Sequence, residues 1–195
     1  MGREKHKRMV EGLFSKSPVV SYSSISRIVK QRWNGKQYVK RLVNYLTKKG
    51  EIKRLAKGYY TKFDDVSLVV FCFQPAYLGL QQALSFHNLW EQETIPVVVT
   101  ARKARPGIRV VLGKNVLIRR IAKKYFFGLD YGRQDKIALP YSDMGKTFLD
   151  MLYFREKISS EALAAFKKRI NRQRLNAYLR SYPKKLRAQA VSLLG

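Results

Sequence analysis

The feature that most constrains the fold lies in residues 36–61, where an amphipathic helix is followed by two short extended segments. At 100° per residue, the apolar side chains of the helix predicted over 36–49 fall on one narrow arc. They are Val39, Leu42, Val43 and Leu46. Gly50 ends this helix, because glycine readily adopts the left-handed conformation found after helix C-termini. Residues 51–61 then predict a hairpin with a tight turn near Lys57 and Gly58. Its inward-facing residues are predicted to be Ile52, Leu55 and Tyr60.

The opposite arc of the same helix carries no acidic residue. Its side chains are Gln37, Arg41, Asn44 and Lys48, with Lys40 beside them. Gln, Arg and Asn have paired hydrogen-bonding groups that match base edges in the major groove of DNA. A face that met only solvent would more often combine Glu with Lys. The pattern therefore favours a DNA-contacting face over a merely solvated one.

Two shorter helices are predicted before this one, over residues 4–15 and 24–30. Ser21 or Ser23 can cap the second, and Val19–Val20 form an extended link. Three helices followed by a basic hairpin is the layout of a winged helix-turn-helix. The hairpin cations predicted to contact phosphates are Lys53, Arg54 and Lys57. The polar turn between the second and third helices adds the candidate contacts Arg32, Asn34 and Lys36.

The charge of the chain points to a polyanionic partner. Lys and Arg number 40 and Asp and Glu 13, a formal excess of 27 positive charges. Self-repulsion of this size works against compaction, so a partner such as nucleic acid explains it better than stability does. Residues 1–62 hold 17 basic and 3 acidic residues, residues 63–155 hold 13 and 8, and residues 156–195 hold 10 and 2. We predict three parts with these bounds: a winged helix-turn-helix domain, an α+β domain and a basic helical extension.

The fold class predicted for the whole chain is α+β, because the middle part combines helices with antiparallel strands. Its predicted elements are a helix over 77–87, strands over 95–101, 108–112, 116–121, 125–127 and 137–139, and a helix capped by Ser142 that runs to 154. Residues 64–74 fit a helix or a strand equally well. Residues 159–195 predict successive short helices, the first capped by Ser159 or Ser160, whose apolar stripes pack onto the body or a partner.

Several short motifs together resemble the AbiEi-type antitoxin family, the regulators of type IV toxin–antitoxin systems, over about residues 10–155. The motif residues in the winged helix are Tyr38, Leu42, Gly50, Ile52, Arg54, Lys57, Gly58 and Tyr60; further along they are Ala76-Tyr77, Ala83-Leu84, Leu89, Ile95-Pro96, Phe126-Phe127-Gly128 and Lys146 to Asp150. Two positions depart from the family pattern: Asn88 stands where a Gly is frequent, and Gly145 stands where the closing motif has a Glu.

The resemblance implies a DNA-binding autorepressor whose second domain opposes a separately encoded, nucleotidyltransferase-like toxin. We expect the protein to bind double-stranded DNA as a monomer or as a weak homodimer on an inverted repeat. Two alternatives stay open: an antitoxin that acts mainly through protein contacts, and an RNA-binding protein, since aromatic residues make up 12% of the chain.

The sequence favours a non-enzyme without a metal or cofactor. His6, His87 and Cys72 are too dispersed for a metal site, and Cys72 is predicted to be a small buried hydrophobic residue. Asp130, Asp135 and Lys136 faintly resemble a nuclease set, but residues 130–133 have the composition of a turn. No apolar run reaches 18 residues, which excludes a membrane-spanning helix, and a single Cys fits the cytoplasm.

Overall fold

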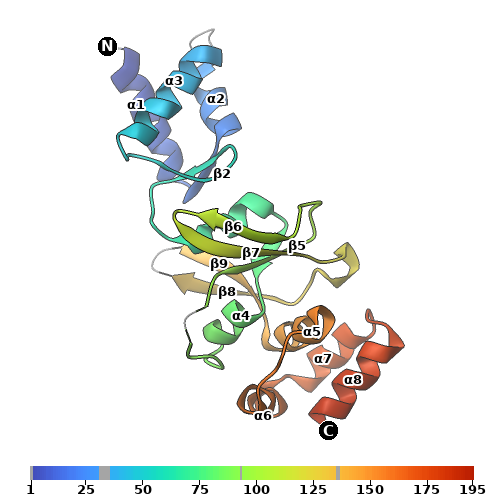
Figure 1. Cartoon of the computed structure of the whole chain (residues 1–195). Coiled ribbons are helices and arrows are strands. Elements are labelled where there is room, and N and C mark those ends of the chain that lie inside the picture. The colour runs from blue at the N-terminus through green and yellow to red at the C-terminus, as the bar shows by residue number, and fades with distance from the viewer. Residues whose placement is uncertain (1, 31–35, 93, 135–136) are drawn as a thin grey trace. The chain divides into compact units, whose positions relative to one another are not determined.

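The computed structural model describes residues 2–30, 36–92, 94–134 and 137–195 (Figure 1). The chain forms two compact units. The N-terminal unit comprises Met1–Cys72 and Val110–Lys114, and the C-terminal unit comprises Phe73–Arg109 and Asn115–Gly195. The residues of the predicted helical extension therefore belong to the same unit as most of the central part. Among the described residues, no helix has the length and apolar character needed to cross a membrane.

The N-terminal unit has the predicted winged helix-turn-helix layout. Its elements are α1 (Gly2–Phe14), β1 (Val19–Ser21), α2 (Tyr22–Lys30), α3 (Lys36–Lys48), β2 (Lys53–Ala56) and β3 (Tyr59–Thr61). Strand β3 pairs antiparallel with both β1 and β2, in the order β1-β3-β2. The segment predicted as an extended link is therefore the third strand of the wing.

An apolar core packs the three helices of the winged helix-turn-helix together, with α2 in contact with both α1 and α3. Its buried residues are Val10, Phe14, Val20, Ile25, Val29, Val39, Leu42, Val43, Leu46 and Ile52. The hydroxyl of Ser21 accepts the backbone N–H of Ser24 at 3.0 Å, which caps α2 as predicted. Gly50 and Gly58 have φ values of +71° and +78°, so glycine suits both turns.

The segment that the sequence left open is a 3-10 helix, η1 (Val66–Phe73). Asp65 begins it, because its carboxylate accepts the backbone N–H of Ser67 at 2.8 Å. Cys72 lies in this helix with 3% of its surface exposed, which confirms the prediction of a buried cysteine.

Most of a six-stranded sheet, in the order β6-β7-β5-β4-β9-β8, lies in the C-terminal unit. The strands are β4 (Ala76–Leu78), β5 (Val97–Thr100), β6 (Gly107–Val111), β7 (Lys114–Arg120), β8 (Leu129–Gln134) and β9 (Ile137–Ser142). The β4–β5 and β8–β9 pairs are antiparallel, whereas β4–β9 and β5–β7 are parallel. The fold is α+β as predicted, with a mixed rather than an all-antiparallel sheet.

The helix predicted over residues 77–87 is wrong in its first half. Residues 76–78 are the inner strand β4, and the helix α4 is short (Gln81–Phe86). Tyr77 and Leu78 are fully buried in the sheet, where a continuous apolar run gives no periodicity that distinguishes strand from helix. Gly79 then allows the close approach of β5: a Cβ at this position would lie 2.9 Å from Cγ2 of Val99.

Three further local predictions are corrected. Residues 125–127 are not a strand, since a 3-10 turn, η2, covers Lys123–Tyr125. Residues 130–133 are not a turn but part of β8, where Asp130 is paired with Tyr141. The side chain of Asp143, not that of Ser142, caps the following helix by accepting the N–H of Lys146 at 2.7 Å.

Four helices complete the C-terminal unit: α5 (Met144–Phe154), α6 (Ser160–Arg169), α7 (Arg172–Leu179) and α8 (Lys184–Leu194). Helix α5 contacts the other three (Figure 1). Ser159 caps α6 as predicted, and Phe166 is fully buried in the same core as Tyr77 and Leu149. The predicted packing of the terminal helices onto the body is confirmed. Of the apolar residues that the sequence predicts to pack from the last helix, Ala190 and Leu194 are buried, whereas Val191 is 60% exposed.

Burial of Cys72 predicts a specific loss of stability at alkaline pH. Burial raises the pKa of this thiol from 9.0 to about 12. Below pH 9 both folded and unfolded chains keep the proton; between pH 9 and 12 only the unfolded chain releases it, so unfolding becomes more favourable. Relative to Cys72→Ala, the wild-type free energy of unfolding should fall by about 1.4 kcal/mol per pH unit over this interval. Urea denaturation of both proteins at pH 8, 9, 10 and 11 measures the difference, and a difference that is constant with pH contradicts the prediction.

Candidate nucleic-acid interface

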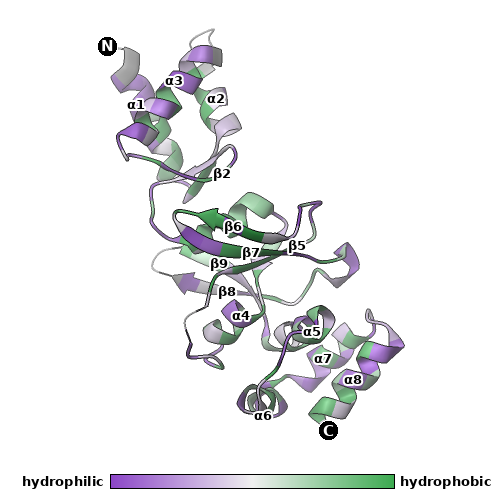
Figure 2. Cartoon of the chain, viewed as in Figure 1, coloured by the Kyte–Doolittle hydropathy of each residue, from purple (hydrophilic) through white to green (hydrophobic). Residues whose placement is uncertain are grey.

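Helix α3 is fixed in rotation by its apolar side. Val39, Leu42, Val43 and Leu46 are each at most 3% exposed. Successive residues are rotated by 100° about the helix axis. Because these four residues point into the core, the polar residues between them point away from it. Figure 2 shows the resulting mixture of hydrophilic and hydrophobic residues along α3.

The polar side of α3 lies in solvent, as the sequence predicts. Its exposed residues are Gln37, Lys40, Arg41, Asn44 and Lys48. Among the described residues, none of these five side chains forms a hydrogen bond or an ion pair, so their donors and acceptors are free for a ligand. Lys36 begins the helix. The other two predicted contacts, Arg32 and Asn34, lie outside the described residues.

The three predicted wing cations differ in how they are engaged. Lys53 forms an ion pair with Asp64, whose side chain is 80% exposed. Nε of Arg54 donates to the carbonyl oxygen of Ala56 at 3.3 Å. Lys57 is exposed at the hairpin turn and has no partner among the described residues. Because exposed ion pairs contribute little stability, a phosphate can replace Asp64 beside Lys53 at small cost.

A buried contact that the sequence did not predict anchors the start of α3. Nδ1 of His6 lies 3.0 Å from the hydroxyl of Tyr38, and His6 is 3% exposed. A second contact joins α1 to the segment after α3, where Lys7 pairs with Glu51 at 2.9 Å. Helix α1 therefore holds α3 near both of its ends. Neither pairing has a sequence signal, because the partners are more than 30 residues apart.

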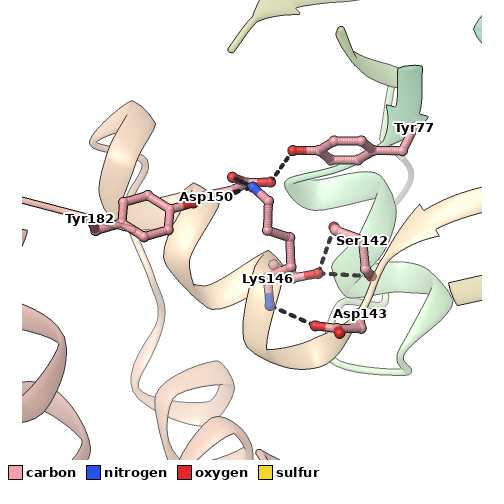
Figure 3. Close-up of polar contacts among 7 residues, drawn as sticks. Tyr77, Ser142, Asp143, Lys146, Asp150 and Tyr182 are labelled. Atoms are coloured by element: carbon pink, nitrogen blue, oxygen red, sulfur yellow. Dashed lines mark hydrogen bonds and ion pairs between the residues drawn. The ribbon is translucent and has the colours of Figure 1, made fainter. Parts of the chain in front are cut away.

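A buried polar cluster lies in the C-terminal unit, at the closing motif of the family resemblance (Figure 3). Lys146 and Asp150 form an ion pair one turn apart on α5, and both side chains are fully buried. The hydroxyl of Tyr77 donates to Asp150 at 2.6 Å, and Nζ of Lys146 lies 3.4 Å from the hydroxyl of Tyr182. Figure 3 shows Tyr77 meeting the pair from one side and Tyr182 from the other.

Burial shapes the protonation of this cluster. Loss of solvation lowers the pKa of Lys146 and raises that of Asp150, and their mutual attraction opposes both shifts. Burial also raises the pKa of the Tyr77 hydroxyl, which keeps it a donor to the carboxylate. Each charge is compensated by the other and by hydrogen bonds, and neither is open to solvent. The cluster therefore fastens α5 to β4 and to the segment before α8.

Glycine is required beside this cluster at residue 128, the last residue of the Phe-Phe-Gly motif. Its φ is +67°, and a Cβ there would lie 2.9 Å from Cβ of Lys146 and 3.1 Å from the ring of Tyr178. The Tyr178 hydroxyl donates to Asp143 at 2.6 Å, which ties α7 to the start of α5. The motif thus packs against the cap of α5.

The described residues weighed for enzymatic chemistry lie in or next to different elements of the fold. In the described part of the chain, no three of His, Cys, Asp and Glu lie close enough together to hold a metal ion. Nε2 of His87 lies 2.8 Å from the carbonyl oxygen of Ser142. Asp130 lies in β8, and Asp135 and Lys136 fall outside the described residues.

The fold has a known counterpart. The crystal structure of the RV2827C protein from Mycobacterium tuberculosis is similar to this chain with a TM-score of 0.64 and 15% sequence identity, covering 96% of this chain and 75% of that one. At this identity the likeness shows a shared fold. No family model matches the chain, and no curated protein matches it.

The Lys146–Asp150 pair should behave as a coupled unit in stability measurements. Lys146→Met alone leaves a buried carboxylate without its cation, and Asp150→Leu alone leaves a buried ammonium without its anion. Each single change should cost about 3–5 kcal/mol, and the double change should cost less than either. Urea denaturation followed by circular dichroism gives the four free energies of the cycle. Costs that simply add in the double variant would show that the two groups do not depend on each other.

Proposed function

We propose that this chain is a sequence-specific double-stranded DNA-binding transcriptional regulator that inserts α3 into the major groove. The observation that supports this most strongly is the acid-free face of α3. Gln37, Arg41 and Asn44 are exposed there, engaged by no other described residue, and held in direction by the buried side of the helix.

The dimensions and chemistry of α3 suit this role. Its 13 residues span roughly 20 Å, and the major groove, about 12 Å wide, admits an α-helix. Arg41 can donate two hydrogen bonds to O6 and N7 of a guanine, and Gln37 or Asn44 can pair with N6 and N7 of an adenine. These bidentate contacts would provide sequence preference.

The wing and the surrounding charge would provide affinity. Lys57 and Arg54 lie on the hairpin that follows α3, and Lys40 and Lys48 flank the base-contacting residues. In a winged helix docked by its third helix, such cations contact phosphates and release counterions.

The resemblance to AbiEi-type antitoxins supports a more specific form of the proposal. The chain would then repress its own operon and oppose a separately encoded nucleotidyltransferase-like toxin. In this form DNA binding belongs to the N-terminal unit and toxin neutralisation to the C-terminal unit. Arg41→Ala should then abolish repression while neutralisation of a toxin from a neighbouring reading frame continues.

Substitutions on α3 and on the wing should have different effects on DNA affinity. We expect Arg41→Ala to cost about 1–3 kcal/mol on a duplex enriched from a random pool and to relax preference at one base pair. Lys57→Ala should weaken all duplexes alike and lower the slope of log K against log salt by about one unit. Fluorescence anisotropy titrations at several salt concentrations, on the enriched duplex and on a scrambled one, measure both effects.

Lys168→Ala serves as a matched control, because it removes an exposed cation from α6 and leaves α3 and the wing intact. Equal losses from Arg41→Ala on enriched and scrambled duplexes contradict base contact by α3. Tighter binding to a structured RNA competitor than to duplex DNA contradicts the proposed ligand class.

A further inference from the structure

A groove of about 760 Å³ opens in the C-terminal unit, between the segment after α4 and the start of α6. Leu89, Trp90 and Ala165 form its apolar wall. Glu91, Glu161 and Lys157 form its charged rim. The groove therefore combines an aromatic surface with two carboxylates and one ammonium.

Two neighbouring carboxylates without an ion-pair partner among the described residues are notable in this chain, which has 13 acidic residues and 40 basic ones. Four of the others form ion pairs: Glu51, Asp64, Asp150 and Glu156. Within the described residues, Glu91 and Glu161 pair with no cation. Glu161 lies in the first turn of α6, and hydrogen bonds from its own backbone N–H and from Ser159 and Ser160 lower its pKa. Its negative charge is therefore stabilised without neutralisation.

The indole N–H of Trp90 has no hydrogen-bond acceptor among the described residues. The ring is partly buried against the core, and the N–H itself is buried. A buried donor without a partner costs free energy. Tryptophan also has the aromatic ring that best attracts a cation placed over its face, and it is enriched where protein interfaces concentrate their binding energy.

We propose that this groove binds an arginine side chain on a segment of a partner protein, with the guanidinium over Trp90 and between Glu91 and Glu161. The two carboxylates outnumber the one ammonium on the rim, so the groove favours a cationic occupant over a phosphate. An arginine matches the groove in both properties, since its guanidinium stacks on aromatic rings and donates paired hydrogen bonds to carboxylates.

This site is independent of the DNA-binding proposal. Its residues all belong to the C-terminal unit, whereas α3 and the wing belong to the N-terminal unit. Loss of one function by substitution should therefore leave the other unchanged.

The chain offers a direct optical test, because it has only two tryptophans. In full-length Trp33→Phe, fluorescence reports on Trp90 alone. The probe is the peptide acetyl-Gly-Leu-Arg-Leu-Gly-amide, compared with the same peptide carrying citrulline, which has the shape of arginine without its charge. We expect a saturable change with the arginine peptide at low salt and at least tenfold weaker binding of the citrulline peptide. Glu91→Gln combined with Glu161→Gln should weaken the arginine peptide at least tenfold.

The matched control is Glu4→Gln combined with Glu11→Gln, which removes the same charge from α1 of the N-terminal unit. This pair should leave peptide affinity within twofold, and both double variants should retain the circular dichroism spectrum of the parent. The groove variant should also retain the DNA affinity of the parent. The proposal is overturned by the absence of a saturable change, by equal binding of the two peptides, or by equal losses in the two double variants. Loss of DNA affinity in the groove variant alone would also overturn it, since the groove would then serve the nucleic acid.

Discussion

The burial of four aliphatic side chains on α3 is the interaction on which the account of this protein rests. Val39, Leu42, Val43 and Leu46 together contribute roughly 6–12 kcal/mol of hydrophobic stabilisation, at about 1.5–3 kcal/mol each. This is comparable with the whole stability of a small domain. Rotating α3 about its axis would expose this surface, so Arg41 and Asn44 stay turned outward as long as the unit is folded. The outward direction of the polar side of α3 is therefore maintained by the same packing that keeps the unit folded.

The charge of the N-terminal part opposes this packing. Residues 1–62 contain 17 basic and 3 acidic residues. Within the described residues, Lys7 of this part pairs with Glu51, and Lys53 pairs with Asp64, which follows this part in the chain. Both pairs include exposed or partly exposed groups and offset little of the repulsion. A compact core tolerates this repulsion, and binding to DNA phosphates would relieve it. The excess of positive charge is therefore unfavourable in the free chain and would favour binding to DNA.

Among the described residues, the C-terminal unit differs from the N-terminal unit because it contains a fully buried ion pair. This pair lies on α5, where Tyr77 of β4 and Tyr182 before α8 contact it. A separate hydrogen bond from Tyr178 to Asp143 ties α7 to the start of α5. Elsewhere in this unit, Glu91 and Glu161 stay unpaired with cations among the described residues, beside Trp90. The N-terminal unit thus exposes a basic face on α3, and the C-terminal unit has a groove beside α6 that is lined by Trp90, two carboxylates and Lys157.

Local patterns predicted the N-terminal unit and the direction of Arg41, because helical periodicity, a terminating Gly50 and a hairpin turn are signals within a few residues of each other. They failed at Tyr77, where an inner strand has no alternation, and at Asp130, where pairing with β9 outweighs a turn-like composition. The spacing of Lys146 and Asp150 is visible in the sequence, but their burial is not. The groove at Trp90 joins segments about 70 residues apart, which only the folded chain brings together.

Methylation interference tests the central claim most directly. Dimethyl sulfate methylates guanine at N7, which faces the major groove, and adenine at N3, which faces the minor groove. On a duplex enriched by this protein from a random pool, we predict that N7 methylation of a few clustered guanines prevents binding. N3 methylation of adenines within the same binding site should not prevent it. Binding that is insensitive to every N7 methyl group would contradict the insertion of α3 into the major groove.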